Sequence, residues 1–283
     1  MRWQMSRKST NVEDRRGMTM PRAGGIGCLG LIVIMAIAYF TGSNPLELLQ
    51  QVGTDTSAPV QQRTSTPAAN DTEGEFMRHV LGSTEDAWSQ IFASEGMQYR
   101  VPTLVLFEDQ VQSACGFSSA AVGPFYCPPD QKVYIDLSFF QQLSRQFGAS
   151  GDFAQAYVIA HEVGHHVQNL LGISEQIERA RSRAGERDAN RLSVMLELQA
   201  DCLAGVWGHY ANQKERILDP GDIEEGLNAA QSIGDDLIQK RSQGYVNPDS
   251  FTHGTSQQRA YWLRRGLESG QVGACNVMEA GGI

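Results

Sequence analysis

The chain has 283 residues, 41% of them hydrophobic, which allows one sizeable globular domain with additional segments rather than two large domains. Its net charge is −9 at pH 7, yet residues 1–23 hold six Lys and Arg residues against Glu13 and Asp14 and carry +4, so the remainder carries −13. A remainder this acidic excludes a nucleic-acid partner, because phosphate groups bind to a positive field.

The basic segment 1–23 is followed by an uncharged apolar run from Gly24 to Phe40. As a helix this run is about 26 Å long, which spans a thin hydrocarbon core when flanking residues snorkel. We therefore predict a transmembrane signal-anchor helix at 24–41. The positive-inside rule then places 1–23 in the cytoplasm and the later residues outside the cytoplasmic (inner) membrane. A signal peptide cleaved after residues 36–38 is the alternative, although the apolar run continues past that point.

Residues 42–74 are rich in Thr, Ser, Gln, Pro and Ala and predict a flexible linker. Residues 75–283 have the composition of a globular domain, which contains Cys115, Cys127, Cys202 and Cys275. An even number of cysteines in an oxidising, extracytoplasmic compartment predicts disulfides. Three pairings are possible. The short loop between Cys115 and Cys127 favours that pair and leaves Cys202 with Cys275, while a buried free thiol at Cys202 is the alternative.

The domain begins with few strands and continues with many helices. Helical periodicity covers 76–96, and strands are expected at 103–109 and 132–138. Further helices are expected at 153–171, 189–212, 222–240 and 255–269, with Gly172 closing the first of these and Thr255 or Ser256 capping the last. This order of elements predicts an α+β fold.

The segment HEVGH, residues 161–165, places two histidines four positions apart on one helix face. His161 and His165 can therefore direct their imidazoles at one metal ion, and neutral imidazole is a ligand suited to zinc. Glu162 lies at the edge of that face and can take a proton from an activated water molecule. The pattern also arises by chance, but apolar flanking residues bury this helix. Gly164 lets another backbone approach closely.

A catalytic zinc site needs a third protein ligand and one open position. In the segment SVMLELQADCLAGVW, Glu197 and Asp201 lie four positions apart among apolar residues. Burying two acids requires a cationic partner, which zinc and its histidines would supply. We expect Glu197 to bind zinc and Asp201 to accept the free N–H of a ligand histidine. A solvated acidic stripe is the alternative. His166 points about 100° away from His165 and is expected beside the site or at the surface.

The segments HEVGHH and, 31 residues after His166, ELQAD resemble the Glu-zincin metallopeptidases. The resemblance is closer to the bacterial neutral zinc metallopeptidase family, whose members are membrane-anchored and carry an HExxHH helix and a terminal FTHGTS segment. It covers most of residues 75–283. It implies a zincin-like domain, with a small N-terminal sheet that has an edge strand and a mostly helical remainder. It also implies one zinc per chain, bound by His161, His165 and Glu197, with Glu162 as the general base.

His253 lies in SFTHGTSQQRAYW, just before the last helix. By resemblance to thermolysin-like enzymes, it would donate a hydrogen bond to the developing oxyanion, whereas a loop histidine that caps the helix is the alternative. Tyr245 is a weaker candidate for that role. Asp235 and Asp236 either orient His253 or form a solvated pair on a helix. Residues 114–137 would supply the edge strand that binds an extended substrate, or form a structural hairpin only.

These features predict a zinc-dependent peptidase that hydrolyses polypeptide substrates at the outer face of the cytoplasmic membrane. The opposing class is a catalytically silent, membrane-tethered binding or assembly factor with a structural zinc, which would have no need of Glu162. An amidase acting on cell-wall peptide could use the same zinc site. The natural substrate is not defined by the sequence.

Overall fold

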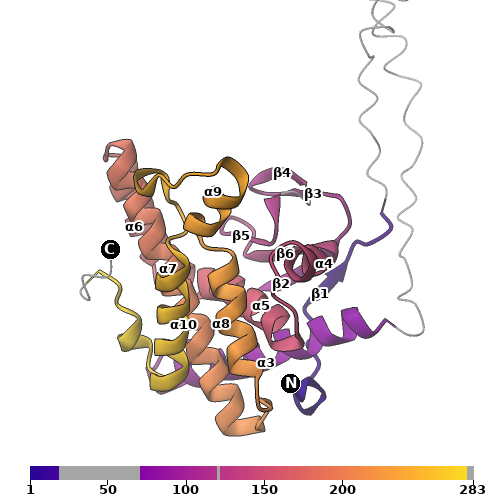
Figure 1. The fold of residues 1–283 in the computed structure, drawn as a ribbon. Helices are drawn as coiled ribbons and strands as arrows, with labels where there is room; N and C mark the ends of the chain where they lie inside the picture. Colours follow the sequence, from indigo (N-terminus) through magenta and orange to yellow (C-terminus); the bar gives the residue numbers. More distant parts are fainter. Residues whose placement is uncertain (19–70, 120–121, 279–283) are drawn as a thin grey trace, which may run out of the picture. The chain divides into compact units, whose positions relative to one another are not determined.

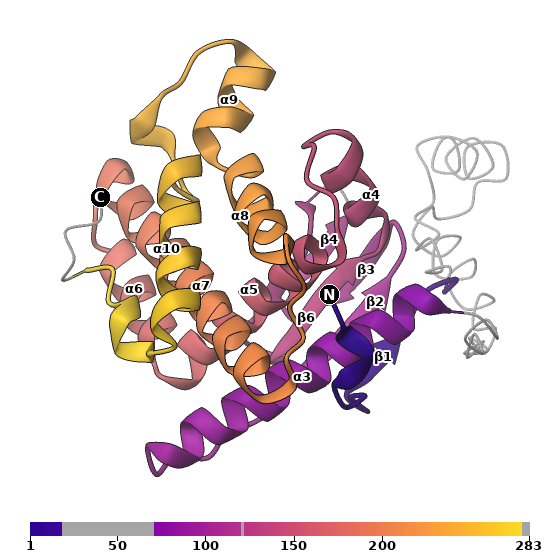
Figure 2. The same cartoon turned by 60° about the horizontal axis from the view of Figure 1, so that its bottom comes forward.

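The computed structural model describes residues 1–18, 71–119 and 122–278, and in it the buried helix α5 (Asp152–Leu170) lies between a small sheet and a group of helices. Figures 1 and 2 show the sheet on one side of α5 and the helices of the C-terminal half on the other. This arrangement agrees with the predicted α+β class, a small sheet followed by a mostly helical part.

The sheet has the strand order β1-β2-β6-β5. Its strands are β1 (Val12–Asp14), β2 (Thr103–Phe107), β5 (Phe125–Cys127) and β6 (Lys132–Asp136). β1 pairs with β2 and β2 with β6 in parallel, whereas β5 runs antiparallel to β6. A hairpin of β3 (Gln110–Ser113) and β4 (Gly116–Ser119) forms a separate two-stranded sheet.

The central strands β2 and β6 are buried along almost their whole length because both of their faces are covered. Leu104 and Leu106 face the main core with the helices, whereas Val105 and Phe107 face a smaller cluster that includes Val111 of β3. Alternating side chains of one strand therefore join two cores. This burial holds the sheet in a fixed position beside α5.

The helical part is built from segments that pack along α5 and along one another. The described helices are α3 (Thr72–Ser94), α4 (Ser138–Arg145), α5, α6 (Ile173–Arg181), α7 (Glu186–Glu215), α8 (Asp222–Ser232), α9 (Asp235–Gln243) and α10 (Ser256–Ser269), with short 3-10 turns at η1 (Trp3–Met5), η3 (Pro248–Ser250) and η4 (Val272–Cys275). Helices α7 and α8 contact α5, and α10 contacts both of them. Of the two caps that the sequence allowed, Thr255 and Ser256, Thr255 caps α10, in a reciprocal pair of hydrogen bonds with Gln258.

The helix predicted at 222–240 is two helices, α8 and α9, which are interrupted at Ile233 and Gly234. Gly234 has an extended backbone, and a Cβ atom there would lie 2.3 Å from the backbone nitrogen of Ser256. The close approach of the segment before α10 therefore ends α8 and redirects the chain into α9. Helical periodicity did not reveal this break because the contact is distant in sequence.

The N-terminal residues differ from the predicted separate basic segment at 1–23. Residues 1–16 belong to the same compact unit as the described domain. Val12 of β1 pairs with Leu104 of β2, and the guanidinium of Arg7 contacts Glu85 of α3 at 2.7 Å. The basic side chains near the start of the chain therefore neutralise acids of the domain. The linker predicted at 42–74 lies mostly outside the described residues, and its end is the start of α3, capped by Asp71.

The prediction of a transmembrane helix preceding the domain is corrected. Among the residues that the structure describes, no helix is both long enough and apolar enough to cross a membrane. The predicted span, 24–41, lies outside the described residues. The fold is therefore an α+β domain for which no membrane helix is assigned.

Candidate metal centre

Close contact between α5 and α7 brings the predicted ligands together. Gly164 is the contact point, because a Cβ atom at this position would lie 2.9 Å from the carbonyl oxygen of Ala200 and 3.1 Å from its Cα atom. The two helix backbones therefore touch one turn from His161 and next to His165. The close backbone approach that the sequence suggested for Gly164 is present in the structure.

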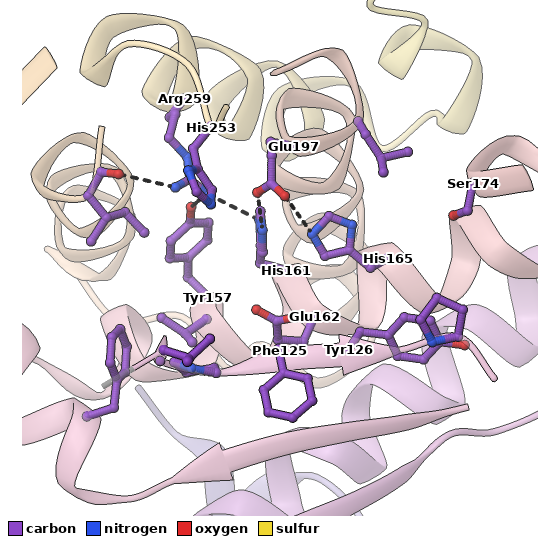
Figure 3. Close-up of a pocket in the computed structure, with 18 of the residues that line it drawn as sticks. Phe125, Tyr126, Tyr157, His161, Glu162, His165, Ser174, Glu197, His253 and Arg259 are labelled. Carbon is purple, nitrogen blue, oxygen red and sulfur yellow. Dashed lines mark hydrogen bonds and ion pairs between the residues drawn. The ribbon is translucent and has the colours of Figure 1, made fainter. Parts of the chain in front are cut away.

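Three side chains on these helices form a cluster of possible metal ligands. The Nε2 atom of His161 lies 3.1 Å from Oε2 of Glu197, and Nε2 of His165 lies 3.4 Å from Oε1 of the same carboxylate. One ligand atom from each residue lies within 4.8 Å of the other two. Figure 3 shows the carboxylate of Glu197 between the two imidazoles. Two imidazoles and one carboxylate, open on one side to a cleft, are a donor set suited to a catalytic zinc ion.

Asp201 fixes the orientation of His161. Its Oδ1 atom lies 2.8 Å from Nδ1 of His161 and accepts a hydrogen bond of 2.6 Å from the hydroxyl of Tyr157. Arg259 binds the same carboxylate through Nε and Nη2, at 2.9 and 3.0 Å. A carboxylate only accepts hydrogen bonds, so Nδ1 of His161 carries a proton and Nε2 faces Glu197.

Electrostatics at the cluster favour a positive charge between the two acids. Burial raises the pKa of Asp201, but Arg259 and His161 outweigh burial and lower it to about 2. Burial lowers the pKa of His161, but Asp201 and Glu197 outweigh burial and raise it to about 10. Burial raises the pKa of Glu197 as well, but His165 and His161 outweigh burial and lower it. Asp201 is paired with Arg259, whereas the ionised Glu197 faces the two imidazoles, so a positive charge is favoured at that position, which a bound divalent metal would supply.

Glu162 lies beside this cluster, on the side toward Phe125 of β5 (Figure 3). Its side chain is largely buried, and no hydrogen bond or ion pair with a described residue engages its carboxylate. Burial raises the pKa of Glu162, while His161 and His165 favour its ionised form. A buried carboxylate that faces a cleft and has no partner of its own is suited to proton transfer.

A cleft of about 1060 Å³ opens from the cluster. The ligand cluster and Glu162 lie along one part of its wall. Phe125 and Tyr126 of the edge strand β5 form another part, together with His253 and Arg259 from the C-terminal region. Among the described residues, β5 pairs only with β6. The strand at the edge of the sheet therefore borders the metal centre, which is the position that the edge-strand interpretation of residues 114–137 requires.

His253 lies on the cleft wall with a side chain that is 52% exposed. Asp235 holds it in place: Oδ2 of Asp235 accepts hydrogen bonds from the backbone N–H groups of Thr252, His253 and Gly254, and Oδ1 lies 3.2 Å from Nδ1 of His253. The hydrogen bond to Asp235 raises the pKa of His253. Of the two interpretations of Asp235, the orienting role fits this geometry.

Two other predictions about this region differ from the structure. Asp236 accepts hydrogen bonds of 2.7 Å from the backbone nitrogen and the hydroxyl of Ser256, so it supports the start of α10 and is not a solvated acid. Tyr245 is 64% exposed and does not line the cleft. His253 therefore remains as the candidate oxyanion donor from this segment.

His166 is fully buried, contrary to the expectation that it lies beside the zinc site or at the surface. Its Nε2 atom donates to the carbonyl oxygen of Arg100, and its Nδ1 atom lies 2.9 Å from the hydroxyl of Tyr126. Asn169 also donates to that hydroxyl, at 3.0 Å. The second histidine of the HH pair thus fastens the edge strand to α5.

Sequence reasoning missed Tyr157, Gln168 and Arg259. The amide oxygen of Gln168 lies 2.9 Å from Nδ1 of His165, and Arg259 is only 3% exposed. Gln168 is at i+3 from His165, which was an available signal. The need of Asp201 for a cation was another signal, but several arginines could have met it. Tyr157 lies one turn before His161 and reads as an ordinary core aromatic residue.

Two disulfides stiffen the regions around the centre. Cys115, in the turn between β3 and β4, pairs with Cys127, the last residue of β5, and Cys202 of α7 pairs with Cys275 of η4. These are the pairings that the short 115–127 loop favoured. The alternative of a free buried thiol at Cys202 is therefore wrong.

Proteins of similar sequence occur in Escherichia coli and in Mycobacterium. The chain is 48% identical to the uncharacterized protein YpfJ of Escherichia coli K12 over 289 aligned residues, which cover 98% of each chain. It is 42% identical to the uncharacterized protein Mb2605 of Mycobacterium bovis over 212 residues, covering 71% of this chain and 69% of that protein. No solved structure matches the chain. The family model described as "Putative neutral zinc metallopeptidase" matches residues 1–278, and the chain belongs to that family.

Proposed function

We propose that the protein is a zinc-dependent peptidase that hydrolyses peptide bonds in polypeptide substrates. The observation that carries the proposal is that the three-ligand cluster of His161, His165 and Glu197 shares one cleft with the carboxylate of Glu162, which no described residue engages. A zinc site that serves only the fold has four protein ligands and no base. The family description supports the same chemistry.

Glu162 transfers protons in this proposal. Zinc, when bound to the three ligands, would polarise the scissile carbonyl and make a water molecule more acidic. The carboxylate of Glu162 accepts the proton of the attacking water and then delivers it to the leaving amine nitrogen. Its burial supports both steps, because a raised pKa brings a carboxyl group closer to the working pH.

His253 stabilises negative charge on the carbonyl oxygen in this proposal. It lies on the wall of the same cleft, and Asp235 fixes both its backbone and its Nδ1 atom. With Nδ1 directed at Asp235, Nε2 is left to face a substrate. A donor held in place before the reaction stabilises the oxyanion without a cost of reorganisation.

The edge strand β5 supports an extended polypeptide as the substrate. Its outer edge carries backbone groups without a partner strand among the described residues, and such an edge can hydrogen-bond to a peptide. Tyr126 on this strand is fastened by His166 and Asn169, so the edge is held rigidly against α5.

The test compares zinc content and cleavage of an unstructured protein such as casein in wild type and Glu162→Gln. We expect about one zinc per chain in both proteins and a loss of cleavage by a factor of about 10² to 10⁴ in the variant. Glu178→Gln is the control, because Glu178 also lines the cleft but lies on α6 and pairs with Arg181. Wild-type turnover in Glu162→Gln, or a wild type without zinc, contradicts the proposal.

We also propose that the domain works in an oxidising compartment. Two disulfides support this proposal, because they persist where thiols are not kept reduced. All four cysteines of the described domain should resist alkylation in protein unfolded without reductant. Free Cys202 and Cys275 in freshly prepared native protein would argue against it.

A further inference from the structure

A chain of three hydrogen bonds joins His165 to the C-terminal segment. Nδ1 of His165 lies 2.9 Å from Oε1 of Gln168, and Nε2 of Gln168 donates to Oε1 of Gln199 at 3.0 Å. Nε2 of Gln199 in turn donates to the carbonyl oxygen of Cys275 at 3.2 Å. A residue 110 positions away in the sequence therefore reaches a ligand of the metal centre through two amide side chains.

The direction of every bond in this chain is set by backbone carbonyl groups, which only accept hydrogen bonds. Because the carbonyl of Cys275 accepts, the NH₂ group of Gln199 must face it, and the oxygen of Gln199 must face Gln168. The NH₂ group of Gln168 also donates to the carbonyl of Leu196 at 2.7 Å. The oxygen of Gln168 is therefore left to accept a hydrogen bond from His165, so Nδ1 of His165 must carry the proton. Nε2 of His165 is then unprotonated, and its lone pair can bind zinc.

The series of hydrogen bonds that begins at His165 ends at Cys275, and this end is held by covalent and polar contacts. Cys275 is joined to Cys202 of α7 by a disulfide, and both residues are buried. The Nε atom of Arg265 on α10 donates to the carbonyl oxygen of Ala274 at 2.7 Å, which fixes the neighbouring peptide. Gln168 itself is fully buried, so no solvent molecule competes for its amide.

We propose that Gln168, Gln199 and the disulfide Cys202–Cys275 are positioning elements that fix the tautomer and orientation of His165. This inference rests on the zinc site of the proposed function. The disulfide holds the carbonyl of Cys275 in place, that carbonyl orients Gln199, and Gln199 orients Gln168. The metal centre is thereby coupled to the C-terminal segment at both histidines, since Asp201, which binds His161, is the neighbour of Cys202 and is bound by Arg259 of α10.

The test measures zinc affinity by competition with a chelator, independently of peptide cleavage. Gln168→Met removes the acceptor for His165, and zinc affinity should fall by about 10- to 100-fold, as for other partners of metal-binding histidines. Gln199→Met should cause a smaller loss, because Leu196 still orients Gln168. The double variant Cys202→Ala/Cys275→Ala should also lose affinity. Its matched control is Cys115→Ala/Cys127→Ala, which removes the other disulfide and should keep wild-type zinc affinity.

Combined variants separate positioning from a general loss of stability. After Gln168→Met, the added change Gln199→Met should cause little further loss of zinc affinity, because the link to His165 is already broken. Independent structural effects would instead multiply. In the zinc-bound wild type, the Nδ1 proton of His165 should give a slowly exchanging imidazole N–H signal in NMR, and Gln168→Met and Gln199→Met should accelerate its exchange.

The outcomes also distinguish this inference from the proposed function. Wild-type zinc affinity in Gln168→Met, or losses that multiply in the combined variant, overturns the positioning role and leaves the peptidase proposal intact. If the variant without the Cys202–Cys275 disulfide does not fold, the two glutamine variants and their combination still decide. A protein that binds zinc with the expected coupling but cleaves nothing supports the positioning role and contradicts the peptidase function. A wild type that binds no zinc contradicts both.

Discussion

The Nδ1 atom of His161 lies 2.8 Å from the carboxylate of Asp201, and this contact joins the metal centre to the last helix of the chain. Asp201 is completely buried and receives two hydrogen bonds from Arg259 of α10. A buried carboxylate shared between a histidine and an arginine fixes the orientation of the imidazole. Loss of either cationic partner would leave the buried charge of Asp201 less well compensated and would destabilise the fold.

Removing the positive charge of Arg259 beside Asp201 should destabilise the protein strongly. Arg259→Met leaves the charge of Asp201 buried with one partner fewer, and we expect a loss of about 3 to 5 kcal/mol in the free energy of unfolding. Adding Asp201→Asn removes the unpaired charge and should restore part of that loss. Urea unfolding of the three proteins measures the effect. A double variant that is no more stable than Arg259→Met would show that the charge of Asp201 is not the cause.

His253 should affect turnover without affecting the metal. His253→Gln removes the proposed oxyanion donor, and kcat/KM should fall by about 10² to 10³ with unchanged zinc content. Tyr245→Phe is the control from the same segment, since Tyr245 is exposed and does not line the cleft, and it should retain wild-type kinetics. Loss of zinc in His253→Gln, or unchanged kcat/KM, would remove His253 from the proposed mechanism.

The elements that could be predicted from sequence are those whose geometry is local. His161, Glu162 and His165 share one turn of a helix, and Glu197 and Asp201 share another, so their relative positions follow from helical spacing. The apolar residues around both segments indicated burial. The meeting of the two helices was inferred because a catalytic zinc needs a third ligand and two buried acids need a cationic partner, and the resemblance to the Glu-zincins implied the same contact.

The remaining features depend on contacts that are distant in sequence. β1 contains Glu13 and Asp14 and shows no alternation of apolar and polar residues, so its sequence does not predict a strand. Its pairing with β2 is made by backbone groups, which leave no pattern in the side chains. Gln168 and Gln199 look like ordinary polar helix residues, since the neighbouring sequence does not show that the carbonyl oxygen of Cys275 will lie within hydrogen-bond distance of Gln199. The role of His166 was missed because it depends on Tyr126 of β5 and on Arg100 in the segment before β2, both distant in sequence.

The buried His166 should make stability depend on pH. Burial lowers its pKa to about 4 from the ordinary 6.5, because a charged imidazole would lose its solvation in the core. The unfolded chain binds the proton first, so the contribution of His166 to stability is complete above pH 6.5. It is lost as the pH falls from 6.5 toward 4, by about 3 kcal/mol in total.

The measurement for His166 is urea unfolding of wild type and His166→Phe across this pH range. Contributions from the metal centre are present in both proteins, so the difference between the two free energies isolates His166. Wild type should lose about 1.4 kcal/mol more per pH unit than the variant in the middle of the range. Parallel curves for the two proteins would mean that His166 is charged in the folded state.

The contact at Gly164 should control the distance between the zinc ligands. In Gly164→Ala the new methyl group would lie 2.9 Å from the carbonyl oxygen of Ala200, which is backbone and cannot rotate away. Alanine favours a helix over glycine by about 1 kcal/mol, but the clash separates α5 from α7, at a cost of about 1 to 3 kcal/mol. Glu197 is carried away from His161 and His165, so zinc affinity should fall as well.

Gly208→Ala provides the matched control for this contact. A Cβ atom at Gly208 of α7 would lie 2.8 Å from a methyl group of Leu267 of α10, nearly the same distance as at Gly164 of α5. The leucine methyl is the end of a flexible side chain and can move, so α7 can keep its position. Gly208→Ala should therefore retain wild-type zinc affinity, while Gly164→Ala loses it. If both variants bind zinc equally well, the spacing of α5 and α7 does not set the geometry of the ligands, because the side chains alone then absorb the displacement.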